Sequence, residues 1–194
     1  MSTLKLNNLE AATGTTINIA SGDKISGASG AIAVTGSVVQ VVQKVDTATT
    51  TFSNSGAVAT FVTCGSLTQS FTPKFSTSKV LLRACLGHVA TNTADRFAYF
   101  RFSGGNTANG VGDASGSRTR VLAFHYFQNQ VDGTPVTFEY LDSPNTTSAI
   151  TYAVEIAPNY SNGNLGLNFY LANNTDAAYI PLAASTLTIT EIAQ

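Results

Sequence analysis

The stretch "SKVLLRACLGHVA", residues 78–90, decides the fold, because its apolar side chains alternate with the period of a β-strand. Apolar residues occupy both faces of this strand: Val80, Leu82, Ala84 and Leu86 on one, and Leu81, Cys85 and Val89 on the other. Strands that are covered on both faces have this pattern. We therefore expect an inner strand with both faces buried.

The same alternation recurs along the chain from residue 38 onward. In "AITYAVEI", residues 149–156, every second residue is apolar and lies on one face. Further strands are predicted at 38–45, 57–63, 96–102, 119–127, 135–141, 164–171 and 185–192. Because no window of a dozen residues fits a helical period better, we predict an all-β fold, an antiparallel β-sandwich or jelly roll.

The first 36 residues differ in composition from the rest of the chain. They hold five glycines and no aromatic residue, whereas all eighteen Phe and Tyr residues lie between Phe52 and Tyr179. The sequence therefore predicts two units, an extended β-prone N-terminal arm at 1–36 and a jelly-roll head domain at 37–194.

The predicted arm has few apolar side chains from which to build a core. In "TGTTINIASGDKISGASG", residues 13–30, the large apolar side chains are Ile17, Ile19 and Ile25. A strand hides its apolar face only against another layer. Either this segment is disordered or it packs on a partner outside the chain. We expect that it packs on such a partner.

Charge is sparse in this protein and argues against several functions. Charged residues make up 11% of the chain, against about 25% in typical domains. The net charge of −1 offers no basic excess for nucleic-acid binding. No run approaches the roughly 18 apolar residues of a membrane span, and no signal peptide is evident. We therefore expect neither nucleic acid binding, nor membrane insertion, nor Sec-dependent export.

Residues that could carry catalysis are few. His88 and His125 lie on predicted strands, and neither is near a nucleophile motif such as G-x-S-x-G, so packing roles are expected. The aspartates expected to cap turns are Asp95, Asp113, Asp132, Asp142 and Asp176. A glycosidase carboxylate pair remains the alternative. We predict no enzyme activity, no cofactor and no metal.

The two cysteines show neither the C-x-x-C spacing of a redox motif nor a Cys/His metal spacing. Cys64 and Cys85 both lie in apolar, strand-like surroundings. We predict two buried free thiols, while a disulfide is the alternative.

The most distinctive loop is "SGGNTANGVGDASGSRTR", residues 103–120. Its five glycines and its polar side chains suit an adaptable binding loop on a rigid scaffold. We predict Asn106, Asn109, Asp113 and Arg118 as its ligand-binding residues, the alternative being a solvated connection between strands.

Several ordered segments resemble one family. The opening "MSTLKLNNLEAATGTTINIASGDKISG" resembles the start of structural proteins of marine tailed bacteriophages, notably the fibre and appendage proteins of cyanophages. The downstream segments "VVQVVQ", "FTPKFSTSKVLL", "GDASGSRTR", "YLDSPNTTSAITYAVEI" and "STLTITEIAQ" resemble the head domain of such fibres. That head is similar to the trimeric jelly rolls of the C1q and tumour-necrosis-factor type.

The resemblance implies a homotrimer on the virion surface that contributes to host attachment, with bacterial surface glycan as a possible ligand. It also implies that the arm, through Ile17, Ile19 and Ile25, joins the chains or binds other virion proteins. Two alternatives stay open: a capsid decoration protein that stabilises the shell, and a carbohydrate-binding jelly-roll module. The absence of Trp counts against the last, because sugar platforms favour large exposed rings.

Overall fold

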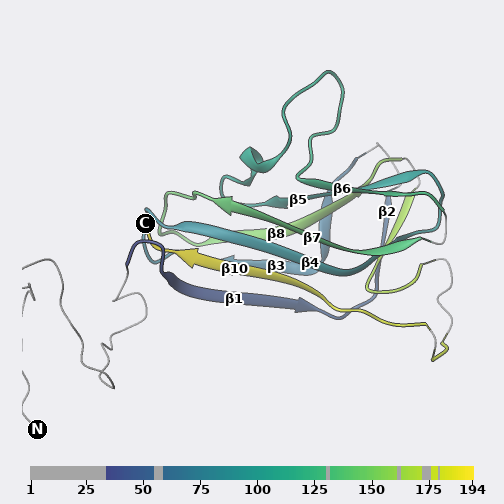
Figure 1. Ribbon diagram of the computed structural model, residues 1–194, viewed down its shortest axis with the longest axis horizontal. Coiled ribbons are helices and arrows are strands. Elements are labelled where there is room, and N and C mark those ends of the chain that lie inside the picture. The colour runs from purple at the N-terminus through teal and green to yellow at the C-terminus, as the bar shows by residue number, and fades with distance from the viewer. Residues whose placement is uncertain (1–33, 55–58, 130–131, 161–162, 172–175, 179) are drawn as a thin grey trace, which may run out of the picture. The chain divides into compact units, whose positions relative to one another are not determined.

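The computed structural model describes residues 34–54, 59–129, 132–160, 163–171, 176–178 and 180–194, and these residues form two packed antiparallel β-sheets (Figure 1). The first sheet has the order β1 (Val38–Asp46), β10 (Ser185–Ile192), β4 (Lys79–Thr91), β9 (Gly163–Leu167) and β2 (Thr50–Asn54), and β7 (Gly133–Asp142) also pairs with β4. The second has the order β3 (Val62–Phe71), β8 (Ile150–Pro158), β5 (Arg96–Ser103) and β6 (Ala123–Phe127). The predicted all-β antiparallel sandwich is confirmed.

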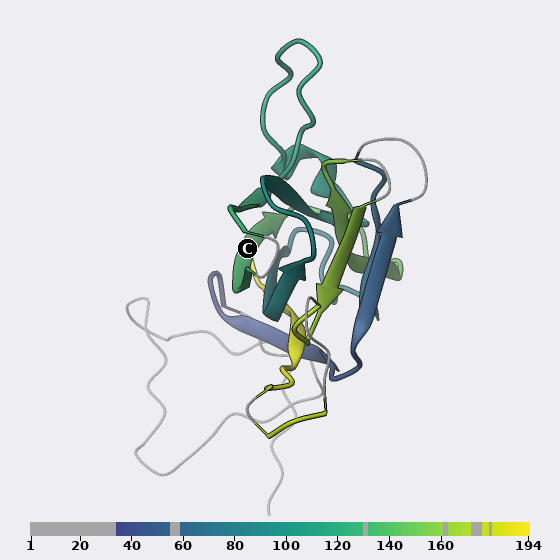
Figure 2. The ribbon, with the colours of Figure 1, turned by 90° about the vertical axis from the view of Figure 1, so that its right-hand side faces the viewer.

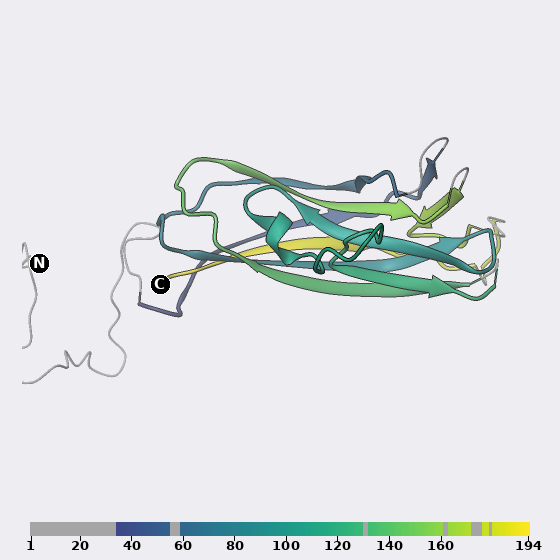
Figure 3. The ribbon, with the colours of Figure 1, turned by 90° about the horizontal axis from the view of Figure 1, so that it is seen from above.

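The order of the strands is that of a jelly roll. With β2 and β9 set aside, one sheet reads β1-β10-β4-β7 and the other β3-β8-β5-β6. The chain then changes sheet at every connection except the one from β5 to β6. Strands of both sheets run along a common long direction (Figure 3), and β2 and β9 lie side by side where they extend the first sheet (Figure 2).

The inner position of β4 is confirmed, but the prediction that both of its faces are buried is wrong. β10 and β7 pair with opposite edges of β4. Arg83 and Cys85 are exposed on its outer face, so the prediction of two buried thiols fails for Cys85. Both cysteines are free, and Cys64 is fully buried, as predicted.

A β-bulge explains the error. The register of β4 against β7 shifts between Leu86 and Val89, which turns Val89 towards the core. The sequence pattern assigned Val89 to the same face as Leu81 and Cys85. The second face is therefore not a continuous apolar stripe.

The predicted strand at 57–63 is misplaced. The structure has β2 before it, which the sequence did not predict, and β3 begins only at Val62. Ala59 has a positive φ of 59°, a conformation that interrupts a strand. Most of the other predicted strands match within a few residues, although β6 begins only at Ala123.

The strand predicted at 164–171 ends early for a similar reason. β9 stops at Leu167 because Asn168 adopts a φ of 66°. The Asn168 amide donates hydrogen bonds to the carbonyls of Asp46 and Ala48, at 2.9 and 3.0 Å. The turn is thus fixed by a buried polar contact rather than by strand pairing.

The core lies between the sheets and is rich in aromatic rings. Phe138 from the first sheet packs on Phe100 and Phe102 from the second, with ring centroids 5.7 and 5.0 Å apart. Buried carboxylates tie loops to this core. Glu191 is fully buried and accepts hydrogen bonds from the backbone N–H groups of Lys74 and Phe75.

Nearly all of the predicted arm, including Ile17, Ile19 and Ile25, lies outside the described residues. The described part of the chain begins beside the end of β10. Gly36 donates its N–H to the carbonyl of Ala193 at 2.8 Å, and Ala193 donates to Ser37 at 2.9 Å. The arm and its boundary stay predictions.

Candidate functional site

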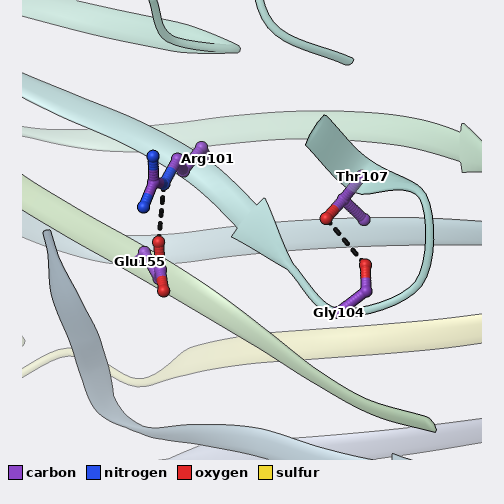
Figure 4. A network of polar contacts seen from close by, with 4 residues as sticks. All are labelled: Arg101, Gly104, Thr107 and Glu155. Carbon is purple, nitrogen blue, oxygen red and sulfur yellow. Dashed lines mark hydrogen bonds and ion pairs between the residues drawn. The ribbon is translucent and has the colours of Figure 1, made fainter. Parts of the chain in front are cut away.

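The loop from Gly104 to Leu122 joins β5 to β6 and stands away from both sheets (Figures 1 and 2). It starts with a tight turn in which Gly104 and Gly105 have φ values of 95° and 54°, which glycine tolerates best. The short helix η1 (Thr107–Gly110) follows. The Thr107 hydroxyl donates a 2.7 Å hydrogen bond to the Gly104 carbonyl and closes the turn (Figure 4).

A buried carboxylate at the end of β7 fixes the base of this loop. Asp142 is fully buried and accepts hydrogen bonds from the Tyr152 hydroxyl at 2.7 Å and from the N–H groups of Ser143 and Asn106 at 2.8 and 3.2 Å. Burial, followed by the hydrogen bond and the negative charge of Asp142, raises the pKa of Tyr152 well above its usual range. A Cβ on Gly105 would collide with the Asp142 carboxylate. The loop base is thus bound to the core.

A cavity of about 680 Å³ lies between the loop, the end of β5 and the segment before β3. Arginine side chains dominate its polar lining: Arg101, Arg118 and Arg120. The first turn of the loop and Phe61 complete the wall. We call this the arginine cavity.

Each guanidinium group at this cavity has at least one polar contact. The Nε of Arg101 lies 2.6 Å from Glu155 Oε2 (Figure 4), and its Cζ lies 3.8 Å from the centre of the Phe61 ring. Arg118 Nη1 donates to Ser115 Oγ at 2.6 Å, and Arg120 Nε donates to the Gly112 carbonyl at 2.6 Å.

Arg101 alone among the three has a carboxylate partner. Within the described ranges, the ion pairs are Arg83–Glu139 and Arg101–Glu155. Arg118 and Arg120 are exposed, and each guanidinium keeps donors that these contacts do not use. The arrangement can therefore hold an anionic group, because Arg binds carboxylates and similar anions through two parallel hydrogen bonds.

A cluster of rings, two half-buried and two exposed, lies next to Arg118 on the outer face of β5 and β6. Phe97 contacts Tyr99, Phe124 and Tyr126, with ring centroids 6.3, 5.8 and 4.8 Å apart. Phe124 is 62% exposed. We call these four residues the aromatic patch.

A second cavity, of about 450 Å³, opens over the aromatic patch and is called the aromatic cavity below. Its lining consists of Phe97, Tyr99, Arg118, Thr119, Val121 and Phe124. Arg118 and Thr119 thus line both cavities. The loop places a cation at the boundary between an arginine-rich site and an aromatic one.

The sequence reasoning missed the aromatic patch, although a signal for it exists. Ala98, Phe100 and Phe102 face the core, so the residues between them, including Phe97 and Tyr99, must point outward. The same alternation in β6 sends Phe124 and Tyr126 outward. Rings at outward positions of two neighbouring strands predict an exposed aromatic surface.

The four predicted ligand-binding residues have different places. Arg118 lines both cavities, whereas Asn106, Asn109 and Asp113 line neither. The side chain of Asn106 donates to the carbonyl of Ser143 at 2.6 Å, which gives it a role in holding the turn. Asn109 belongs to η1, and Asp113 lies in the exposed part of the loop.

The two histidines have packing contacts. His125 lies edge-on to Phe127 at 4.7 Å, and His88 lies 6.5 Å from the ring of Tyr170. Burial lowers the pKa of His88. Within the described segments, neither imidazole is hydrogen-bonded to a serine hydroxyl or a cysteine thiol.

No set of three His, Cys, Asp or Glu side chains in the described part of the chain could hold a metal ion. None of the helices in that same part is long and apolar enough to cross a membrane. The predicted absence of catalysis stays a prediction.

Comparison with known proteins finds no family model that matches the chain and no curated protein that matches its sequence. The resemblance to phage appendage proteins therefore stays a prediction.

Proposed function

We propose that this protein is a structural component of a virion surface, a fibre-like or knob-like appendage that assembles as a homotrimer and contributes to attachment to the bacterial host. The sequence resemblance supports the virion assignment and the trimer. The structural observation that carries the proposal is an outward-facing apolar surface on the first sheet, which suits assembly with further copies of the chain.

This surface is formed by β1, β10, β4 and β7 and is called the aliphatic face below. Strand pairing aligns Val41, Thr190, Leu81 and Leu141 in one row across the sheet. The exposed fractions of the Val38, Val41, Val45 and Leu141 side chains lie between 48% and 59%. A solvated antiparallel face normally carries polar residues at these positions. Such an apolar patch is typical of an interaction surface.

The polar residues of the aliphatic face favour a second copy of the chain as its occupant. The neighbouring row holds Gln43, Thr188, Arg83 and Glu139. Arg83 Nε lies 3.5 Å from Glu139 Oε2, so this row carries both signs of charge and no excess of either. In a closed trimer each chain meets its two neighbours through two different parts of its surface, and a face that offers an apolar row and both signs of charge can pair with complementary parts of further copies.

The opposite part of the head supports attachment. The arginine cavity and the aromatic patch both lie on or beside the β5–β6 loop, away from the aliphatic face in the strand order. Copies that associate through the first sheet would leave these sites free for a bacterial surface glycan. Several weak sites on one oligomer then act together and raise avidity. In this proposal the arm, with Ile17, Ile19 and Ile25, binds other virion proteins.

One alternative gains support from a specific observation. The exposed ring of Phe124 provides the kind of platform that a carbohydrate-binding jelly-roll module needs, so the absence of Trp weighs less than the sequence suggested. A monomer that binds glycans would favour this module over the appendage.

Light scattering coupled to size-exclusion chromatography tests the proposal. The wild-type chain of 20.2 kDa should elute with about three times that mass. The double variant Val41→Glu/Leu141→Glu should be monomeric, because it places two charges in the apolar row. Thr68→Glu/Ser70→Glu, which adds the same two charges at exposed positions of the second sheet, should leave the mass unchanged. A wild-type monomer at tens of micromolar would contradict the proposal.

A further inference from the structure

We propose that Arg118 and the aromatic patch form one binding site for acidic sugar residues, with a carboxylate or sulfate held by Arg118 and the sugar ring packed against Phe124. This inference rests on the proposed attachment function and names the class of glycan that the site takes. It also places the site across two elements, the β5–β6 loop and the outer face of the second sheet.

Arg118 lies where the two cavities meet. It lines both the arginine cavity and the aromatic cavity, and Thr119 does the same. A ligand in the aromatic cavity therefore meets a guanidinium at one end and rings at the other. A sugar acid has this division, with an anionic group attached to a ring that has apolar C–H faces.

The loop orients the Arg118 side chain without neutralising its charge. Its backbone N–H donates to the Ser115 carbonyl at 3.3 Å and its Nη1 to Ser115 Oγ at 2.6 Å. No carboxylate of the described residues pairs with Arg118 or with Arg120. The side chain is thus restrained, and its remaining donors can form a bidentate contact with a carboxylate or sulfate.

The rings of the aromatic patch are accessible and held in place by their neighbours. Phe124 is 62% exposed, although it packs edge-on against Phe97 at 5.8 Å. Tyr126 is tied to Asp95 by a 2.6 Å hydrogen bond, which also raises the pKa of its hydroxyl. The patch is held in place before any ligand arrives, and a preorganised aromatic surface loses little entropy on binding.

Charge distinguishes a sugar acid from the other ligands that rings and arginines bind. Single-stranded nucleic acids also stack on aromatic residues, but they need a groove with many cations along the backbone. Here the loop carries two cations, Arg118 and Arg120, and one anion, Asp113, and the whole chain has a net charge of −1. Two guanidinium groups suit one or two isolated anionic groups. A neutral sugar would leave them without a counter-charge.

Binding measured by titration calorimetry on the full chain tests the site. The probes are hexameric oligogalacturonate for the carboxylate, a sulfated galactan hexasaccharide for the sulfate, and neutral maltohexaose. A single-stranded oligodeoxynucleotide with six phosphates is the polyanion control. We expect at least one acidic glycan to bind at least tenfold more tightly than maltohexaose and the oligonucleotide, a difference of about 1.4 kcal/mol.

Four variants locate the binding within the site. Arg118→Ala should weaken binding of that glycan about tenfold or more. Arg118→Lys keeps the charge but loses the planar pair of donors, so its affinity should lie between those of the wild type and Arg118→Ala. Phe124→Leu should weaken it about fivefold, because the ring face is lost while an apolar side chain remains. Lys74→Ala, which removes an exposed charge that lines neither cavity, should have no effect.

Absence of binding to both acidic glycans, equal binding of maltohexaose or the oligonucleotide, or wild-type affinity in Arg118→Ala would each overturn the inference. Circular dichroism confirms that each variant is folded, and both Arg118 and Phe124 are exposed enough to replace. The mass of the same samples in solution reports on assembly separately. A trimer without glycan binding rejects only this site, whereas a glycan-binding monomer rejects only the proposed assembly.

Discussion

The two sheets of the sandwich present opposite kinds of outer surface. The aliphatic face of the first sheet carries exposed Val and Leu side chains between polar residues, among them the charge pair of Arg83 and Glu139. The second sheet presents the aromatic patch. Beside it lies the β5–β6 loop, whose Arg118 and Arg120 have no carboxylate partner among the described residues. A surface with exposed aliphatic side chains and few charges suits contact with further copies of the chain. A surface with rings, cavities and cations suits a small ligand with an anionic group.

Under the proposed function, one fold separates assembly from recognition by using its two outer faces. Substitutions on the aliphatic face should change the mass in solution and leave glycan binding per chain unaltered. Substitutions on the aromatic patch should do the reverse. The most informative substitution is therefore at a residue that connects the first sheet to the β5–β6 loop.

Asp142 is such a residue, and its loss should have the largest effect. It ends β7 on the first sheet and accepts hydrogen bonds from Tyr152 and from the loop base at Asn106. Asp142→Ala leaves these buried donors unsatisfied, so we expect the free energy of unfolding to fall by about 3 kcal/mol or more. Urea unfolding measures this loss. Asp142→Asn, which keeps the shape and one acceptor, should lose clearly less, and equal losses would show that the hydrogen bonds matter little.

A smaller effect is expected at the glycine turn that starts the loop. Gly105 and Gly116 both have positive φ values, 54° and 58°, but only Gly105 faces the Asp142 carboxylate and the Tyr152 ring. Gly105→Ala should cost about 1–3 kcal/mol and weaken acidic glycan binding, because the loop base must shift.

Gly116→Ala is the matched control for Gly105→Ala. A Cβ at Gly116 meets no atom within 4 Å, so this variant adds the same kind of backbone strain without the collision. Its cost in urea unfolding should be smaller, and the mass of both variants in solution should stay that of the wild type. If the two variants lose equal stability, the contact with Asp142 does not fix the turn.

The smallest effect concerns pH. Burial lowers the pKa of His88 in the folded state, so the unfolded chain binds a proton more readily than the folded chain. The free energy of unfolding should therefore fall as the pH drops below about 6.5, the usual pKa of histidine. His88→Gln should reduce this fall in urea titrations between pH 7.5 and 5.5. Identical pH profiles would contradict the assignment.

The sequence predicts the strands well where alternation is uninterrupted. The strand predicted at 185–192 has the bounds of β10, because every second residue of that segment enters the core. Alternation fails at β4, where the bulge between Leu86 and Val89 changes which residues face inward. It also misses β2, whose sequence "TTFSN" holds one buried ring among polar residues.

The candidate site could be predicted only in part. Arg118 was within reach of sequence reasoning because it ends a glycine-rich polar loop. Phe124 and Arg101 line the two cavities together with Arg118, but they belong to two different strands. The fold of the loop between these strands places Arg118 near both, and the sequence does not show this. The outward position of the rings follows from the alternation in β5 and β6, whereas the absence of Trp points away from a sugar-binding surface.

The reactivity of Cys85 tests the central claim, that the aliphatic face is buried between copies of the chain. Cys85 lies on this face, paired across the sheet with Thr186 and Thr137, and it is exposed in the single chain. Cys64 is buried, and burial raises its pKa, so it serves as the silent internal control. The rate of maleimide labelling at Cys85 should be low in the assembled wild type and high in monomeric Val41→Glu/Leu141→Glu, with Cys64 unlabelled in both. Equally fast labelling of Cys85 in the two proteins would contradict the account.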